Sequence, residues 1–181
     1  MINADILKEL NFDLTKDIIE KLNAWKDCFI EYNSTTNLTS KGDIEVLDEK
    51  HVFDSLSIVN WQGFFSCDKI LDVGCGGGFP SVILAICFSD KKIIANDSRI
   101  EEAQNQNVDL IVSRAVGKIN LVYELSKKHL KKNGKFLIYK SKSYKEEIED
   151  FKKKYKNLKF EVIPYKLPLK ENYERNLVIV G

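Results

Sequence analysis

Several features that would set a chain apart from ordinary globular proteins are missing from this sequence. No apolar run approaches the length that crosses a membrane, and the first residues lack the basic start and apolar stretch of a secretory signal peptide. No internal repeat or low-complexity linker occurs. We therefore expect a cytoplasmic protein without a membrane partner.

Metal-binding patterns are missing as well. The four cysteines stand at positions 28, 67, 75 and 87, and none are in C-x-x-C spacing, which argues against a zinc site. In a reducing compartment these cysteines should remain free thiols. We expect no metal site.

Arginine is scarce, at positions 99, 114 and 175 only, whereas lysine is abundant. The net charge is +1, yet the stretch from Lys127 to Lys159 holds thirteen lysines and only four acidic residues. A basic half of this kind can be the electrostatic footprint of a nucleic-acid-binding protein. It can also be the solvated face of a lysine-rich helix, and charge alone favours this second explanation.

The chain has the composition of one globular domain, with 181 residues, of which 44% are hydrophobic and 30% charged. Apolar residues recur at helical spacing from Leu7 to Phe29, polar turn formers fill 33–40, and a second helix is expected over 45–60. We expect residues 1–60 to form an N-terminal helical extension and residues 61–181 the main domain, together in one compact unit.

After Lys69, short apolar runs alternate with helical stretches. Strands are expected over 70–73, 93–95, 108–112 and 136–139, with a final pair at 160–163 and 177–180. Helices are expected from Pro80, over 121–130, where Asn133-Gly134 should provide the stop, and over 144–155. This alternation predicts an α/β fold in which helices cover both faces of a parallel sheet. Such folds bind ligands at the carboxyl ends of their strands.

The most informative stretch runs from Asp72 to Pro80, between two apolar runs. Glycines at 74, 76 and 78 allow a tight turn and a close approach of a ligand to the backbone. A dinucleotide fingerprint would need a third glycine at Phe79, and a P-loop would need a terminal Gly-Lys-Ser/Thr. Asp72 before the glycines suits a cationic ligand, so the order favours S-adenosylmethionine, with its sulfonium and α-amino group. A glycine turn without a ligand is the alternative.

Other strand ends carry polar residues that can reach the same edge. Asp97 stands where a ribose-binding carboxylate belongs in this topology, although an ordinary acidic loop residue is the alternative. Arg114 follows an apolar strand and could meet a carboxylate or a base edge, or form a structural salt bridge. It is the one candidate for a catalytic residue. His51 fits a packed or capping histidine better than a general base.

If the ligand is a methyl donor, the motifs that the sequence lacks narrow the kinds of atom that could accept the methyl group. Prolines stand only at 80, 164 and 168, so the Asn/Asp-Pro-Pro-aromatic loop typical of methylation at exocyclic base amines is absent. No Pro-Cys pair occurs, which argues against methylation at a pyrimidine carbon. An atom with a lone pair, such as guanine N7, remains possible, and its methylation needs alignment rather than a general base.

The chain resembles the RsmG (GidB) family, the small-subunit ribosomal RNA guanine-N7 methyltransferases, over nearly its whole length. The matching motifs are Tyr32-Asn33-x-x-x-Asn37-Leu38-Thr39-Ser40, Lys50-His51-x-x-Asp54-Ser55, the loop from Asp72 to Pro80, Asp97-Ser98, Ser113-Arg114-Ala115-Val116 and Glu174-Arg175-Asn176-Leu177-Val178-Ile179. The resemblance implies a class I, Rossmann-like methyltransferase fold. It also implies S-adenosylmethionine as donor and 16S ribosomal RNA, or the 30S subunit, as partner. We expect the protein to act as a monomer.

The resemblance also implies roles for single residues. The cofactor-binding candidates are Asp72, Gly74, Gly76, Phe79, Asp97, Ile100, Glu101 and Arg114. By similarity Asp97 would lie near the ribose, and Ile100 and Glu101 near the adenine. The residues expected on the RNA side, or in structural roles, are Asn37, Lys140 and Arg175. A methyltransferase for a small molecule and a non-catalytic protein that binds cofactor or RNA are the alternatives.

One departure from the family separates Ser98 from Arg99. Roughly two dozen residues, about one helix and one strand, are absent there. Their loss would remove an edge strand of the sheet and one wall of the adenine pocket. Either the printed sequence omits a segment, which is our working hypothesis, or the protein truly lacks it. An intact mass above 20.8 kDa would support the first explanation.

Overall fold

A computed structural model of the chain describes residues 1–10, 12–96, 99–141, 144–169 and 173–181. Its centre is one six-stranded sheet with strand order β2-β1-β3-β4-β6-β5. The strands are β1 (Lys69–Val73), β2 (Lys92–Asn96), β3 (Val108–Arg114), β4 (Leu130–Lys140), β5 (Phe160–Leu167) and β6 (Tyr173–Val180). The four strands from β2 to β4 are parallel, and β6 runs antiparallel to both β4 and β5.

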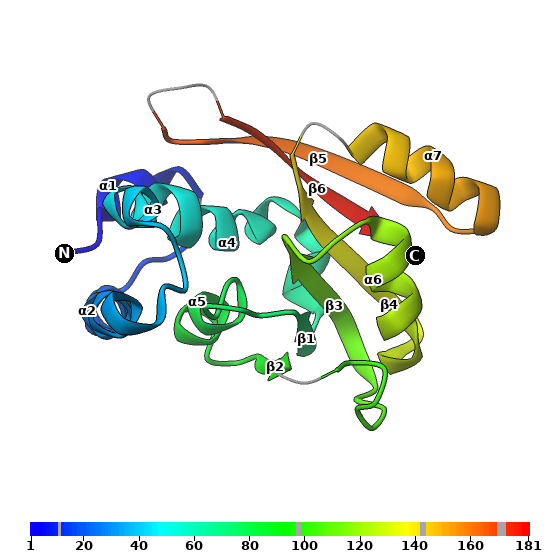
Figure 1. Ribbon diagram of the computed structural model, residues 1–181, viewed down its shortest axis with the longest axis horizontal. Helices are drawn as coiled ribbons and strands as arrows, with labels where there is room; N and C mark the ends of the chain where they lie inside the picture. Colours follow the sequence, from blue (N-terminus) through cyan, green and yellow to red (C-terminus); the bar gives the residue numbers. More distant parts are fainter. Residues whose placement is uncertain (11, 97–98, 142–143, 170–172) are drawn as a thin grey trace.

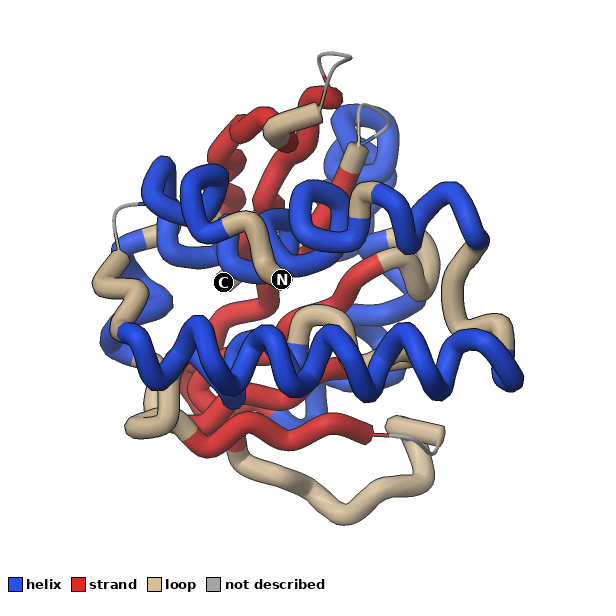
Figure 2. Tube along the Cα trace, turned by 90° about the vertical axis from the view of Figure 1, so that its left-hand side faces the viewer, coloured by secondary structure: helices blue, strands red, loops and turns tan. Residues whose placement is uncertain are grey.

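Helices occupy both faces of this sheet. The α-helices are α1 (Ala4–Leu7), α2 (Lys16–Thr36), α3 (Lys41–Glu45), α4 (Asp54–Leu56), α5 (Ser81–Cys87), α6 (Ile119–Ser126) and α7 (Tyr144–Lys154). Shorter 3-10 turns are η1 (Lys8–Leu10), η3 (Ser57–Asn60), η4 (Gln62–Ser66) and η5 (Lys127–His129), and η2 (Asp48–Phe53) is a π-helix. In Figure 1, α1 to α5 lie on one side of the sheet and α6 and α7 on the other. Figure 2 shows the long helix α2 running across the outer surface of the layer formed by α1 to α5.

Two hydrophobic clusters fill the spaces between the sheet and its two helical layers. Neighbouring residues of one strand belong to different clusters, as Ile70 and Leu71 of β1 do, because side chains alternate across a strand. Most of these strand residues are fully buried, as expected for parallel strands covered on both faces. The N-terminal helices share the cluster of Ile70, which ties the first part of the chain to the sheet.

Local signals explain the ends of the longest helix. The hydroxyl of Thr15 accepts a hydrogen bond from the N–H of Ile18 at 3.3 Å and so caps the first turn of α2. Asn37 adopts a left-handed conformation, with φ of 53°, after the last turn, and its N–H bonds to the carbonyl of Asn33. The predicted break over 33–40 is therefore confirmed from Asn37 onward, although α2 continues to Thr36, and the chain then turns into α3.

Most predicted elements are confirmed within a few residues, but one boundary is wrong. Asn133-Gly134 does not stop a helix, because α6 ends at Ser126 and both residues lie inside β4. The pairing of β4 with β3 shifts register between Val108 and Leu110, and Gly134 sits at this irregularity. A Cβ on Gly134 would meet backbone oxygens of β3 at 3.1 and 3.2 Å, so glycine serves close strand packing here.

At the edge of the sheet, the structure agrees with the expected loss of one helix and one strand after Ser98. β2 ends the strand order and pairs with β1 along its whole length. The described residues between β2 and β3, 99–107, form turns without a further helix or strand. The predicted second helix over 45–60 is helical but irregular, with α3, η2, α4 and η3 in succession. No helix within the described ranges is both long and apolar enough to cross a bilayer.

Candidate active site

The loop between β1 and α5 presents its backbone rather than its side chains. Gly74, Gly76 and Gly78 have φ of 75°, 49° and 88°, a left-handed conformation that residues with a Cβ rarely adopt. The N–H groups of Gly78 and Phe79 bond to the carbonyl of Cys75 at 2.8 and 3.1 Å and close the turn. A Cβ on Gly76 would have no heavy-atom neighbour within 4 Å. The backbone at Gly76 is therefore open to a ligand.

Asp72 lies beneath this loop. The residue is fully buried, and its Oδ2 accepts a hydrogen bond from the N–H of Ser81, at the start of α5, at 3.1 Å. Within the described chain, Oδ1 has no hydrogen-bond partner. Burial raises the pKa of Asp72 to about 7, and the interactions with Ser81, whose N–H is the donor, and the charge of Arg114 offset this only in part. The acid predicted to receive a cation thus forms the floor of the loop, with one oxygen unpartnered.

An aromatic cluster holds the far end of the loop against the N-terminal helices. The buried ring of Phe79 packs edge-on against Trp25 and Phe29 of α2, with centroids 5.7 and 5.2 Å away. It stacks on the imidazole of His51 at 4.6 Å, and the guanidinium of Arg114 lies 5.1 Å from its centre. The glycine loop, the N-terminal layer and the end of β3 therefore meet at one side chain.

A buried carboxylate joins the two arginines predicted as site residues. The side chain of Asp54 is only 2% exposed. Its Oδ2 accepts hydrogen bonds from Nη1 of Arg114 and Nη2 of Arg175, both at 3.1 Å. Its Oδ1 accepts one from Nε of Arg175 at 3.2 Å and another from the hydroxyl of Tyr165. Helix α4 thereby connects the ends of β3 and β6, and we call Arg114, Asp54 and Arg175 the arginine–aspartate cluster.

His51 is part of the same packing and is held neutral. Its Nδ1 accepts a hydrogen bond from Nη2 of Arg114, in the tautomer with the proton on Nε2. Burial, and then the charge of Arg114, lower the pKa of His51 to about 4. These contacts agree with the prediction that His51 is a packed histidine rather than a general base.

Two adjoining cavities open at the carboxyl ends of β3 and β4, and we call them together the strand-end cleft. Their volumes are about 300 and 210 Å³, and they share Ala115 and Arg175 as lining residues. Ala115 has φ of 60°, a strained value for a residue with a Cβ. The same turn packs Val116 against Gly74, where any added Cβ would clash with it. The strand-end cleft therefore borders the glycine loop.

Two further predicted cofactor residues, Ile100 and Glu101, follow the edge strand β2 in the chain. Ile100 is buried in the same hydrophobic cluster as Leu71 and Val73 of β1, whereas Glu101 is exposed. Asp97 lies outside the described residues. The structure thus places Ile100 beside β1, but it brings neither Ile100 nor Glu101 into the strand-end cleft.

The residues predicted on the RNA side have different surroundings. Asn37 is exposed at the end of α2. Lys140 lines the cleft but is 12% exposed and holds both oxygens of Glu147, at 2.9 and 2.7 Å, and the carbonyl of Gly117 at 2.7 Å. Arg175 lines both parts of the cleft. Of the three, Arg175 is the best placed to meet a ligand there.

Several residues that shape the site or the turn before β3 could not be identified from the sequence. Asp54 belongs to a matched motif, but nothing in its spacing shows that it bonds residues 60 and 121 positions away. Tyr165 lies in an apolar strand and carries no motif. His129, fully buried, bonds the carbonyl of Ile100 and the N–H of Gln106, and so fixes the turn before β3. Its rarity, as one of only two histidines in the chain, is the one signal in the sequence that points to it.

The loop fits S-adenosylmethionine in two respects. The backbone at Gly76 is open, and Oδ1 of Asp72, buried beneath the loop, has no partner in the described chain. A buried carboxylate of this kind suits a cationic group better than a phosphate.

Comparison with known protein families places the chain clearly. The family model described as GidB, rRNA small subunit methyltransferase G, matches residues 18–98 and 93–178. The two matches meet where the sequence runs directly from Ser98 to Arg99.

Curated relatives agree with the family model. Ribosomal RNA small subunit methyltransferase G of Lachnoclostridium phytofermentans is 32% identical, over 80% of this chain and 72% of that protein. The proteins of the same name from Listeria monocytogenes and Bacillus subtilis are each 28% identical, over 96% of this chain and 87% and 86% of theirs. These two alignments span 207 positions, more than the 181 residues present, so parts of the relatives have no counterpart here.

Solved structures agree on the fold. An S-adenosylmethionine-dependent methyltransferase from Clostridium acetobutylicum superposes with a TM-score of 0.55 at 14% identity. The match covers 83% of this chain and 98% of that one. The predicted class I methyltransferase fold is therefore confirmed.

Proposed function

Because this chain belongs to the GidB family, rRNA small subunit methyltransferase G, it is an S-adenosylmethionine-dependent methyltransferase, and we propose that it methylates N7 of a guanine in small-subunit ribosomal RNA. The observation that carries the proposal is the junction at Arg114. This residue touches Phe79 of the glycine loop and lines the strand-end cleft. Donor and acceptor sites that share one wall meet the main requirement of a direct methyl transfer, which is alignment.

The groups proposed to hold S-adenosylmethionine are the backbone of Gly74, the open backbone of Gly76 and the carboxylate of Asp72 beneath them. Arg114 stands at the methionine side, where its guanidinium can pair with the carboxylate of the cofactor. Ile100 and Glu101 are assigned to the adenine side. When bound, S-adenosylmethionine supplies an electrophilic methyl group on its sulfonium.

The chain's own contribution is positioning. Guanine N7 carries a lone pair, so no side chain has to remove a proton before transfer. His51 agrees with this, because its lowered pKa and its bond from Arg114 give it a structural place. The strained turn at Ala115 fixes the wall between the two sites. Since A-form RNA buries N7 in a deep, narrow groove, the target guanine must be unstacked or in a loop.

The test is methyl transfer from labelled S-adenosylmethionine to small ribosomal subunits and to naked RNA, both from a strain that lacks this gene. We expect label at a guanine N7, detected by aniline cleavage of the chain. Arg114→Gln should lower kcat/KM by about tenfold or more, since a charged hydrogen-bonding group is lost. The proposed monomer is checked by light scattering of the same preparation.

Two other outcomes would replace the proposal. Label in a small molecule but not in RNA, with little dependence on salt, would indicate a small-molecule methyltransferase. Measured cofactor binding without transfer to any RNA would indicate a binding protein, and the edge position of β2 would then be the first place to look for the cause.

A further inference from the structure

A third cavity adjoins the strand-end cleft on the side of the β5–β6 hairpin, and we call it the hairpin cavity. Its volume is about 570 Å³. Its lining includes Tyr144 and Lys145 from the start of α7, Lys166 from β5, and Glu174 and Arg175 from β6. Because Arg175 also lines both parts of the strand-end cleft, the two spaces meet at this residue.

The hairpin cavity carries positive charge that the protein itself does not neutralise. Lys145, Lys166 and Arg175 contribute three positive charges against the one of Glu174. Within the described residues neither Lys145 nor Lys166 forms an ion pair, and both are exposed. Arg175 is paired with Asp54 through Nε and Nη2, which leaves Nη1 without a partner in the described chain.

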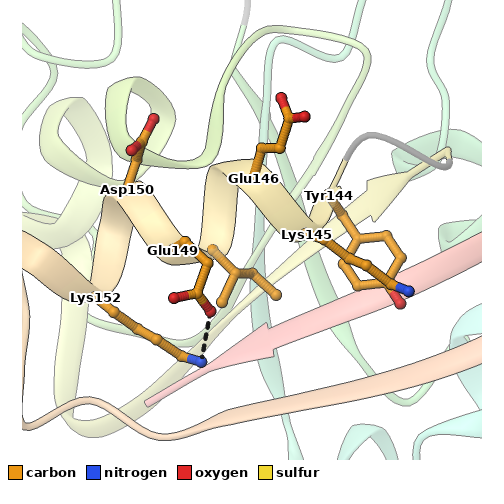
Figure 3. A pocket seen from close by; sticks show the side chains of 7 residues that line it. Tyr144, Lys145, Glu146, Glu149, Asp150 and Lys152 are labelled. Carbon is orange, nitrogen blue, oxygen red and sulfur yellow. Dashed lines mark hydrogen bonds and ion pairs between the residues drawn. The ribbon is translucent and has the colours of Figure 1, made fainter.

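A neighbouring cavity on α7 shows that this charge is local. It is larger, about 690 Å³, and shares Tyr144 and Lys145 with the hairpin cavity. Its other lining residues include three acids, Glu146, Glu149 and Asp150, against Lys152. Figure 3 shows Lys152 drawn to Glu149, at 3.1 Å, while Glu146 and Asp150 point to the other side of the helix. Beyond Lys145, the cation of the neighbouring cavity, Lys152, is therefore already paired with an acid.

We infer that the hairpin cavity binds the nucleotide of single-stranded RNA next to the one held in the strand-end cleft. Tyr144 offers a ring on which the base can stack, and Lys145 and Lys166 lie where its phosphates would pass. The combination of an aromatic side chain with unpaired cations is the usual means of holding single-stranded nucleic acid. The inference rests on the proposed function, since it places the flanking nucleotide of the same RNA substrate.

The experiment measures the affinity of the full chain for an oligouridine RNA with one central guanosine, across a series of salt concentrations. Lys145→Ala with Lys166→Ala is the test variant, and Lys153→Ala on the same helix, paired with Asp150, is the matched control. We expect the double variant to bind about tenfold more weakly at low salt and to show a flatter salt dependence, by about 0.7 in slope for each lost phosphate contact. The control should match the wild type.

Stacking is tested separately at Tyr144. Tyr144→Phe should keep the affinity, and Tyr144→Ala should lower it about fivefold or more, because the ring supplies the contact. Equal affinity and equal salt slope in the lysine double variant and the Lys153→Ala control would overturn the inference. RNA binding that behaves as expected in a protein that transfers no methyl group would support the cavity and refute the proposed activity. Absence of oligonucleotide binding by a wild type that still methylates small subunits would overturn the inference and leave the proposed activity standing.

Discussion

Two basic regions of this molecule use their charges in opposite ways. In the arginine–aspartate cluster, the side chains of Arg114 and Arg175 are 11% and 17% exposed and share one carboxylate, Asp54. On the outside of α7, Lys152, Lys153 and Lys154 are each at least half exposed and each pairs with an acid, although Lys154 shares Glu124 with Lys127. The first region holds an excess of positive charge next to a cavity, and the second is locally neutral.

The difference teaches that a count of charged residues does not locate a binding surface. The lysine-rich stretch attracts attention in the sequence, yet the lysines in the last turn of α7 pair with Glu149, Asp150 and Glu124. This agrees with the alternative of a solvated helix face. Buried pairs are also energetically different, because a charge left without its partner cannot recover its hydration. The cluster should therefore respond strongly to substitution, and the outer lysines should not.

Removal of Asp54 should have the largest effect. Asp54→Ala leaves two mostly buried guanidinium groups and the hydroxyl of Tyr165 without their acceptor. We expect the free energy of unfolding to fall by about 3–5 kcal/mol, the usual cost of breaking a buried pair. Urea denaturation followed by tryptophan fluorescence measures it.

Asp48→Ala is the matched control for function. Asp48 is also buried in the N-terminal layer, but it holds Lys26 and the N–H of Asn3, both at 2.7 Å, away from the cleft. Both variants should lose stability, whereas only Asp54→Ala should weaken RNA binding under conditions where each remains folded. If both variants bind RNA equally well, the cluster is a structural feature without influence on the cleft.

Two glycines, one beside the strand-end cleft and one in α3, should also respond differently to substitution by alanine. Gly74→Ala should destabilise the protein by about 1–3 kcal/mol, since φ of 75° is strained for alanine and the new Cβ would clash with Val116. Gly42→Ala in α3 should act in the opposite direction, by about 0.5–1 kcal/mol, because a Cβ there meets nothing within 4 Å. Thermal unfolding of both variants tests the pair, and a shift of the same sign would contradict it.

Much of the fold could be predicted because its signals are local. Alternating apolar runs predict the strands, and the glycine loop predicts the β1–α5 turn and its cofactor. The cluster around Asp54 could not be predicted in this way, since its partners lie up to 121 positions apart. Gly134 shows the same limit, because the glycine that looked like a helix stop serves strand pairing through contacts with β3.

The pH dependence of stability should show two buried groups of the site acting against each other. His51 has a pKa near 4 in the folded chain against 6.5 when exposed, so the unfolded state binds its proton first and stability rises with pH over that interval. Asp72 has a pKa near 7 against 3.8, so the folded state holds its proton and stability falls with pH over nearly the same interval. The wild type should therefore vary little between pH 4 and 6.5.

Single variants separate these two contributions. Asp72→Asn should make stability rise with pH across the interval, and His51→Gln should make it fall. Asp43 and Asp109, whose pKa values lie below 3.8 through bonds to Lys50 and Lys131, act at lower pH and leave this interval unaffected. Denaturation midpoints at several pH values test this prediction. Identical pH profiles for the two variants would show that His51 and Asp72 do not have opposite effects on stability.

The smallest effect of a substitution is expected on the outside of α7. It tests directly whether the outer lysines differ from the arginine–aspartate cluster. Lys153→Ala removes an ion pair with Asp150 in which both side chains are more than half exposed, so water and salt already screen the charges. The melting temperature and the RNA affinity should both stay within experimental error of the wild type. A clear loss of RNA affinity would show that these lysines exchange their acidic partners for phosphate. The RNA-binding surface would then extend from Lys145 along the outside of α7, and pairing in the free protein would not be a guide to the charge available to a ligand.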